Sequence, residues 1–263
     1  MTGQWSDNVG YDFTGRHIVV VGGASGIGAE IVAVLSGAHA DIDVYDRVEP
    51  QSDGFRDFTR VDVREAGALE RAIEETIGRH GPVDGLVYAV GVLDGYAALD
   101  ESTDELIATV LDINVVGAIR AIRAVAPGMR SDGFGRIVVF GSIAGQVAGA
   151  GGLSYTVSKH AITGLVKHLA VELGPFGITV NAVAPGSIQG TNIRTTIAEV
   201  ATAPVSTTRG LGTMDAEAVS RLYPVGRLGT VAAVAPTVAM LMSAESWFIT
   251  GTTSLIDGGY VAR

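Results

Sequence analysis

The chain has 263 residues, of which 47% are hydrophobic and 17% charged, so it can bury the core of one large α/β domain. Its formal net charge of −10 disfavours nucleic acid and anionic membranes as partners. The absence of cysteine excludes disulfides, thiol nucleophiles and thiolate metal sites. Residues 1–11 are polar and no apolar run reaches about 20 residues, so we expect a cytoplasmic protein with no membrane segment.

Short apolar runs alternate with longer segments of helical period along the first half of the chain. The apolar runs predict strands over residues 17–22, 41–45, 58–61 and 83–90. Helical spacing predicts helices over residues 26–35 and 65–79. The run from Ser102 to Glu105 has the pattern of a capping box, and we expect it to open a long helix that ends near Met129.

The second half continues this alternation. It predicts strands over residues 136–140, 178–183 and 253–256 and helices over residues 154–173 and 231–242. The whole pattern predicts one domain of α/β class, a Rossmann-type doubly wound parallel sheet in three α/β/α layers. We expect residues 1–12 to be an N-terminal extension and the long irregular stretch 186–223 to be a substrate loop or lid.

A glycine-rich turn follows the first predicted strand and opens the first predicted helix. It reads Gly22-Gly-Ala-Ser-Gly26-Ile-Gly28, and its glycines allow the backbone to approach a pyrophosphate at a helix N-terminus that favours anions. Asp46 ends the second strand about twenty residues further on, where an acid can accept hydrogen bonds from ribose hydroxyls. This context favours dinucleotide binding over an ordinary tight turn.

Tyr155 and Lys159 lie four residues apart on a predicted helix, so the phenol and the ammonium share one face. A free tyrosine has a pKa of about 10, which the charge of Lys159 and an oxidised nicotinamide would lower. Ser142 follows a predicted strand at the carboxyl edge of the sheet, where its hydroxyl can orient a substrate oxygen. With the glycine turn, these residues predict hydride transfer between a nicotinamide cofactor and an alcohol or ketone.

Taken together, these motifs resemble those of the short-chain dehydrogenase/reductase family over about residues 13–260. The family's glycine motif appears as Val21 to Gly28, and its Asp-Val pair after the third strand appears as Asp62-Val63. The Asn181 to Gly186 run and the closing Asp257-Gly-Gly are also similar. The family's four catalytic residues match Asn114, Ser142, Tyr155 and Lys159.

The resemblance implies a role for each matched residue. Tyr155 would be the general acid/base, and Lys159 would lower its pKa and hold the nicotinamide ribose. Ser142 would bind the substrate oxygen, and Asn114 would hold a water that links Lys159 to solvent. The cofactor-binding residues that it implies are Gly22, Ser25, Gly26, Ile27, Gly28, Asp46, Arg47, Asp62, Val63, Ala89, Gly91, Tyr155, Lys159, Pro185, Gly186 and Ile188.

The resemblance also implies a homotetramer. The two long predicted helices carry apolar residues on more than one face, for example Val116, Ile119 and Leu165, and such helices are usually buried on both sides. In the family, the matching helices pack into a four-helix subunit interface.

Two positions near the cofactor depart from the family pattern. Val21 stands where the family has threonine, and Tyr88-Ala-Val-Gly91 stands where it has Asn-Asn-Ala-Gly. In the family these positions brace each other by hydrogen bonds, and both are more apolar here, so we expect packing to replace the polar brace. Thr191 lies one position later than the family's threonine, which makes Ile188 the better candidate for contact with the cofactor amide.

Asp46 predicts NAD(H) as the cofactor in preference to NADP(H), because its carboxylate would repel a 2′-phosphate. Arg47 is the counterargument, since a guanidinium beside the ribose could bind that phosphate. We expect strand alternation to turn Arg47 away from the direction that Asp46 faces.

The substrate pocket is expected to be lined by residues 93–96, 143–153 and 187–223. Members of these ranges that favour a medium-sized, largely apolar alcohol or ketone are Ala148, Gly149, Ala150, Gly151, Val205 and Leu211. Arg194, Arg209 and Arg221 could bind a carboxylate, but surface positions are expected for all three. Trp247 is expected to be a packing residue.

The same residues argue against two other kinds of function and against a metal site. A dinucleotide-binding sensor or scaffold without turnover would have lost a catalytic residue. A lyase such as a halohydrin dehalogenase would replace Lys159 by arginine and lose the glycine turn, and neither change is present. The histidines form no ligand set, since no carboxylate lies at metal spacing between His160 and His168, so no metal is expected.

Overall fold

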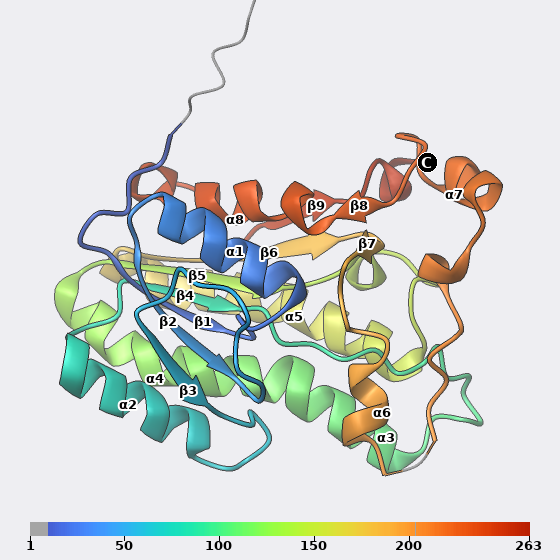
Figure 1. The fold of residues 1–263 in the computed structure, drawn as a ribbon, viewed down its shortest axis with the longest axis horizontal. Coiled ribbons are helices and arrows are strands. Elements are labelled where there is room, and N and C mark those ends of the chain that lie inside the picture. Colours follow the sequence, from blue (N-terminus) through green and yellow to red (C-terminus); the bar gives the residue numbers. More distant parts are fainter. Residues whose placement is uncertain (1–9, 203) are drawn as a thin grey trace, which may run out of the picture.

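Seven parallel strands form the central sheet of a computed structural model that describes residues 10–202 and 204–263 (Figure 1). Their order is β3-β2-β1-β4-β5-β6-β9, so the chain winds one way from β1 to β3 and the other way from β4 to β9. The predicted doubly wound sheet is therefore confirmed. The strands are β1 (His17–Val21), β2 (Asp41–Asp46), β3 (Asp57–Arg60), β4 (Gly85–Tyr88), β5 (Gly135–Phe140), β6 (Ile178–Pro185) and β9 (Thr253–Ile256). Trp5 and most of the predicted N-terminal extension lie outside the described residues.

Helices cover both faces of the sheet and give the three predicted layers (Figure 1). One face carries α1 (Gly26–Gly37) and α8 (Ala235–Met242), and the other carries α2 (Ala68–His80), α4 (Gly117–Asp132) and α5 (Leu153–Leu173). Successive residues of β1 pack alternately into two hydrophobic cores, one on each face of the sheet. Val19 and Val21 pack toward α2 and α4, and Ile18 and Val20 pack toward α1 and α8. A parallel strand buried on both faces needs apolar side chains throughout, which is why β1 reads as a continuous apolar run.

A π-helical segment, Asp112–Val116, interrupts the long predicted helix between α3 (Asp104–Leu111) and α4. Tyr88, at the end of β4, donates a hydrogen bond of 2.7 Å to the carbonyl oxygen of Ile113 in this segment. A Cβ atom on Gly117 would overlap the Tyr88 hydroxyl, so the phenol fills space that only glycine leaves. Tyr88 thus makes its hydrogen bond to the helix and not to Val21, a contact that the sequence did not predict. Its neighbour Val21 is packed as expected.

The start of α3 also differs from the predicted capping box. The N-cap is Thr103, whose hydroxyl oxygen accepts a hydrogen bond of 3.2 Å from the amide of Leu106. Ser102 instead donates to the carbonyl oxygen of Ala98 at 2.8 Å. The predicted box is one residue out of register, which places Glu105 in the first turn, where a negative charge is favourable.

The stretch 186–223 contains short regular elements in place of the irregular loop that was expected. These are β7 (Ile188–Gln189), α6 (Thr196–Val200) and α7 (Ala216–Leu222), and β7 pairs with β8 (Gly229–Thr230). Asp215 caps α7 by accepting a hydrogen bond of 2.8 Å from the amide of Ala218. Within the described parts of the chain, no helix combines the length and apolar character that crossing a membrane requires.

Candidate active site

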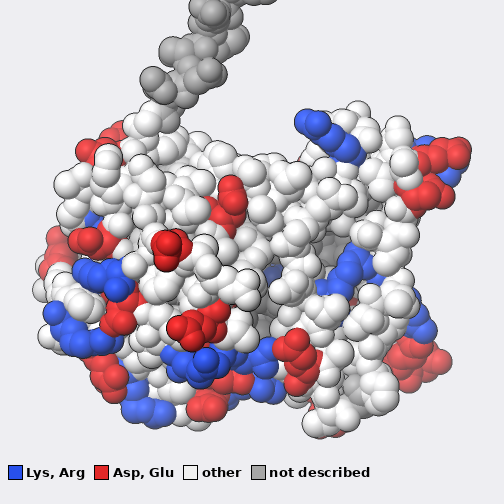
Figure 2. Space-filling view, in the orientation of Figure 1, with Lys and Arg blue, Asp and Glu red and all other residues white. Residues whose placement is uncertain are grey.

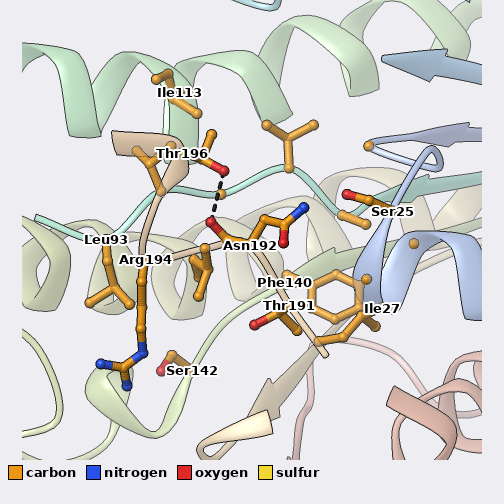
Figure 3. A pocket seen from close by; sticks show the side chains of 18 of the residues that line it. Ser25, Ile27, Leu93, Ile113, Phe140, Ser142, Thr191, Asn192, Arg194 and Thr196 are labelled. Atoms are coloured by element: carbon orange, nitrogen blue, oxygen red, sulfur yellow. Dashed lines mark hydrogen bonds between the residues drawn. The ribbon is translucent and has the colours of Figure 1, made fainter. Parts of the chain in front are cut away.

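A cleft of about 320 Å³ opens where the strands of the sheet end. It brings together every residue predicted to bind the cofactor, along with Ser142. In the space-filling view a hollow opens on the side of α6 and α7, with basic side chains visible in it (Figure 2). Figure 3 shows the two ends of the cleft: Ser25 lies near the start of α1, and Ser142 and Arg194 lie at the other end.

Glycines shape the first end of this cleft. Gly22 has a φ of +85°, and a Cβ atom there would lie 2.9 Å from the amide nitrogen of Val90. A Cβ atom on Gly28 would overlap the carbonyl oxygen of Gly22, so the turn and α1 can pack this closely only without side chains. Ser25 is the extended N-cap of α1 and makes no side-chain cap, and the first turn holds no acid. The first amides of α1 can therefore take an anion, so the cradle suits the pyrophosphate of a dinucleotide.

Asp46 and Arg47 border the cleft beside this cradle. The carboxylate of Asp46 accepts hydrogen bonds from the amides of Ala24, at 3.1 Å, and Val48, at 3.3 Å. The expectation that Arg47 turns away is wrong, because β2 ends at Asp46 and strand alternation does not extend to the next residue. The Arg47 guanidinium instead pairs with Glu199 of α6, with Nη2 and Oε2 2.8 Å apart.

A second arginine makes a similar connection to the end of α6. Arg64 forms a two-pronged ion pair with Asp62 and also donates to the carbonyl oxygen of Val200 at 3.4 Å. The hydrogen bonds from Arg64 lower the pKa of the Asp62 carboxyl, so Asp62 stays ionised. The chain after β2 and the chain after β3 are thus each bonded to α6, through Arg47 and Arg64.

Tyr155 and Lys159 project from α5 into the buried floor of the cleft, where they are 5% and 2% exposed. Lys159 Nζ lies 5.4 Å from the centre of the Tyr155 ring and donates a hydrogen bond of 2.8 Å to the carbonyl oxygen of Phe140. Burial raises the pKa of Tyr155 to about 12, although the Ser142 hydroxyl beside it acts in the opposite direction. Burial also lowers the pKa of Lys159 to about 7. Lys159 is not among the groups that shift the pKa of Tyr155 in the protein alone, so the lowering expected from its charge does not appear.

Asn114 lies behind the cleft, within the π-helical segment, and is not among the residues that line it. Its amide exchanges two hydrogen bonds with the backbone of Val92, at 2.8 and 3.0 Å, and donates a third to Ser158 at 3.1 Å. A Cβ atom on Gly91 would lie 3.5 Å from Lys159 Nζ and 3.6 Å from Asn114 Oδ1. The side chains of Lys159 and Asn114 therefore both lie close to the backbone of Gly91.

Asp94 is a fully buried carboxylate that the sequence did not reveal. It accepts hydrogen bonds from the amides of Tyr96, Gly152 and Tyr155 and from the Ser154 hydroxyl, all between 2.9 and 3.1 Å. A Cβ atom on Gly152 would lie 2.6 Å from both carboxylate oxygens. Asp94 thus caps the N-terminus of α5 and holds the backbone of Tyr155. The one available signal is that the N-cap of α5 is Gly152, which has no side chain to cap the helix itself.

The substrate end of the cleft is mostly apolar. Its lining includes Leu93, Tyr96, Ile143, Ala150 and Leu211, which pack into one cluster with Tyr155. Four residues expected to line it, Ala148, Gly149, Gly151 and Val205, do not border the cleft. Val205 packs against the main core instead, where it lies over Gly95.

The three arginines that could bind a carboxylate lie in different surroundings. Arg209 and Arg221 form ion pairs with Glu101 and Glu217 at the exposed surface, as expected. Arg194 borders the substrate end of the cleft, so the expectation of a surface position is wrong for this residue.

A doubly wound sheet with this glycine cradle beside a buried tyrosine and lysine is typical of nicotinamide-dependent oxidoreductases of Rossmann type. The family model described as enoyl-(acyl carrier protein) reductase matches residues 22–261. The short-chain reductase protein NovJ of Streptomyces niveus is 34% identical, with 92% of each chain covered. The 3-oxoacyl-[acyl-carrier-protein] reductase MabA of Mycobacterium avium is 30% identical, with 94% of this chain and 90% of that protein covered.

Solved structures agree. The ligand-free aldohexose dehydrogenase of Thermoplasma acidophilum aligns with a TM-score of 0.84 at 25% identity and covers 97% of both chains. ElxO with NADP bound aligns with a TM-score of 0.82 at 25% identity, over 94% of this chain and 99% of ElxO. The chain belongs to the short-chain dehydrogenase/reductase family and is an oxidoreductase that acts with a nicotinamide cofactor.

The depressed pKa of Lys159 makes the stability of the protein depend on pH. Between the folded value of about 7 and the ordinary value of 10.5, the unfolded chain binds more protons, so stability rises with pH in this window. One such group contributes a slope of up to about 1.4 kcal/mol per pH unit. Replacing Lys159 by methionine should remove this contribution. Urea unfolding of both proteins at several pH values above 7 measures it, and parallel stability curves would show that Lys159 is not desolvated as described.

Proposed function

We propose that this protein interconverts a secondary alcohol and the corresponding ketone with NAD(H), and that Tyr155 is the general acid/base. The observation that carries the proposal is the burial of Tyr155 and Lys159 in the same cleft as the glycine cradle, with Ser142 beside the phenol. The sequence also retains each of the four residues that match the family's catalytic set.

A nicotinamide bound in the cleft would supply or accept the hydride. The chain itself handles the proton. Because the pKa of Tyr155 is raised to about 12, its phenol holds a proton at neutral pH and can donate it from Oη to a ketone oxygen.

Ser142 and Lys159 would position the reacting groups. The Ser142 oxygen accepts a hydrogen bond of 3.1 Å from the amide of Ala144, so its hydroxyl hydrogen can be donated to the phenol oxygen of Tyr155 or to a substrate oxygen that takes the same place. Lys159 Nζ uses one hydrogen on the carbonyl of Phe140, so its other hydrogens can serve the cofactor ribose and the tyrosine. We assign to Asn114 the water that links Lys159 to solvent.

Replacing Tyr155 by phenylalanine tests the acid/base role. The ring and its packing stay, and only the transferable proton is lost, so kcat should fall by roughly 10²–10⁴-fold while cofactor affinity is kept. The measurement is nicotinamide absorbance with a panel of ketones and alcohols, together with calorimetric titration of the cofactor. Near-parental kcat in the variant would exclude Tyr155 from proton transfer.

Two features of the cradle support NAD in preference to NADP. The Asp46 carboxylate borders the cleft at the end of β2, where a 2′-phosphate would meet a like charge. At about 4 Å and an effective dielectric of 20, each unit of like charge costs about 4 kcal/mol before screening. Arg47 could offset this cost, but its guanidinium is already neutralised by Glu199. ElxO binds NADP, so use of this cofactor occurs among similar structures.

The cofactor preference can be measured both by kinetics and by binding. We expect kcat/KM and calorimetric affinity to favour NAD at least about tenfold, since that requires only about 1.4 kcal/mol. Asp46→Asn, which keeps the hydrogen-bond acceptor, and Glu199→Gln, which frees Arg47, should each improve NADP binding. Glu217→Gln, which breaks an exposed ion pair on α7, is the matched control. Equal affinity for both cofactors in the parent would refute the assignment.

We also propose a homotetramer. Val116, Ile119 and Val157, on the two long helical segments, are 38%, 37% and 50% exposed, although apolar. Trp247, expected to pack, is 67% exposed beside Phe248 at 84%. Large exposed apolar side chains of this kind usually mark contact surfaces. Light scattering at micromolar concentration should give four times the mass of the chain, and a monomeric mass would rule the proposal out.

A further inference from the structure

Arg194 is a cation at the substrate end of the cleft for which the described residues provide no counter-ion. It is half-buried and lies in the segment between β7 and α6. Its Nη1 donates a hydrogen bond of 2.8 Å to the carbonyl oxygen of Arg209. Within residues 10–202 and 204–263, no carboxylate lies within ion-pair distance of its guanidinium, whereas Arg209 and Arg221 both have one.

The guanidinium is held in place at the wall of the cleft. A Cβ atom on Gly212 would overlap Arg194 Nη2, so the glycine provides the space in which the guanidinium lies. The same Cβ atom would lie 3.1 Å from the hydroxyl oxygen of Ser187, which also lines the cleft. Arg194 and Ser187 therefore both lie beside Gly212 in the same part of the cleft wall. In Figure 3 the Arg194 side chain extends toward the end of the cleft that holds Ser142.

The surroundings of Arg194 are otherwise apolar, with Leu93, Ile143 and Leu211 in the same part of the lining. A guanidinium placed partly out of water among apolar groups is unfavourable unless an anion or good acceptors compensate it. Apart from Lys159, the other charged residues of the lining lie at the cofactor end. There Arg47 is paired with Glu199, and Arg64 is paired with Asp62.

Three acids of the surrounding segments are engaged in contacts of their own. Asp94 accepts hydrogen bonds from the start of α5. Asp257, close to Gly186, accepts from the amides of Gly259 and Val261 at 3.0 and 2.8 Å. Glu101 forms its ion pair with Arg209. Within the described residues Arg194 thus has no carboxylate partner, and a molecule that enters the cleft can supply one.

We propose that the substrate carries a carboxylate, which Arg194 and Ser187 bind while the reacting carbonyl faces Tyr155 and Ser142. The substrate class is then an oxo acid and its hydroxy acid, with an apolar chain between the two groups. A planar guanidinium forms paired hydrogen bonds with a carboxylate, and one guanidinium with one hydroxyl suits a single negative charge. This inference rests on the proposed alcohol and ketone chemistry.

The test uses oxo acids of graded chain length, each paired with its methyl ester, and the full protein with its preferred reduced cofactor. The parent should prefer the acids. Arg194→Gln should lower kcat/KM for the acids by roughly 10- to 100-fold, the range of a charge-assisted hydrogen bond, and change the esters little. Arg194→Lys should retain part of the preference, because the charge remains but the fork is lost. Arg221→Gln, an exposed arginine on α7, is the control and should behave like the parent.

Calorimetric titration of the acids and esters into the protein loaded with cofactor separates this inference from the proposed function. Turnover without an acid preference, or with a preference that survives Arg194→Gln, overturns the carboxylate assignment alone. If no acid or ester is reduced, the panel of ketones and alcohols decides the proposed function, and the titration still decides the inference. Acid binding that Arg194→Gln abolishes supports it, and equal binding in parent and variant overturns it.

Discussion

The parallel direction of all seven strands is the constraint on which the site depends. Parallel strands end at one edge, so segments far apart in the sequence deliver Gly22, Asp46, Ser142 and Pro185 to a single cleft. The helix that follows β1 begins at the same edge, with its free amides directed at the cleft. Since the winding direction changes between β1 and β4, the loops there diverge and leave room for a ligand.

The chemistry depends on burial that would be unfavourable in a purely structural setting. Tyr155 and Lys159 are removed from water, which favours the neutral form of each. Asp94, also buried, remains tolerable because four donors surround its carboxylate. The same contacts hold the first turn of α5, so the residue that caps the helix also holds the backbone of the tyrosine. Packing and reactivity are therefore set by one small group of contacts.

Much of this architecture follows from local patterns in the sequence. Apolar runs and helical periods locate most strands and helices, because each element repeats the spacing of its buried face. The glycine turn and the Tyr155 to Lys159 spacing locate most of the cleft, because both are motifs of residues close together in the sequence.

Features set by distant contacts could not be predicted in this way. The partners of Asp94 at the start of α5 and at its N-cap lie 58 to 61 residues away. Arg47 follows the last residue of its strand, so the alternation of side chains along a strand does not predict its direction. The position of Arg194 depends on how the segment after β7 folds over the cleft. The wrong capping box at Ser102 shows that a motif alone does not fix its register.

The π-helical segment between α3 and α4 has an evolutionary consequence. A π turn is an α-helix with one additional residue, and such bulges are common at functional sites. Deleting one residue here would restore a regular helix and keep α3 and α4 in about the same relative rotation, because the bulge already absorbs the additional residue. Asn114 lies inside the bulge, so its side chain would leave the position from which it donates to Val92 and Ser158. A deletion here should therefore spare the fold and disturb the site, which means that the additional residue is retained for the position of Asn114.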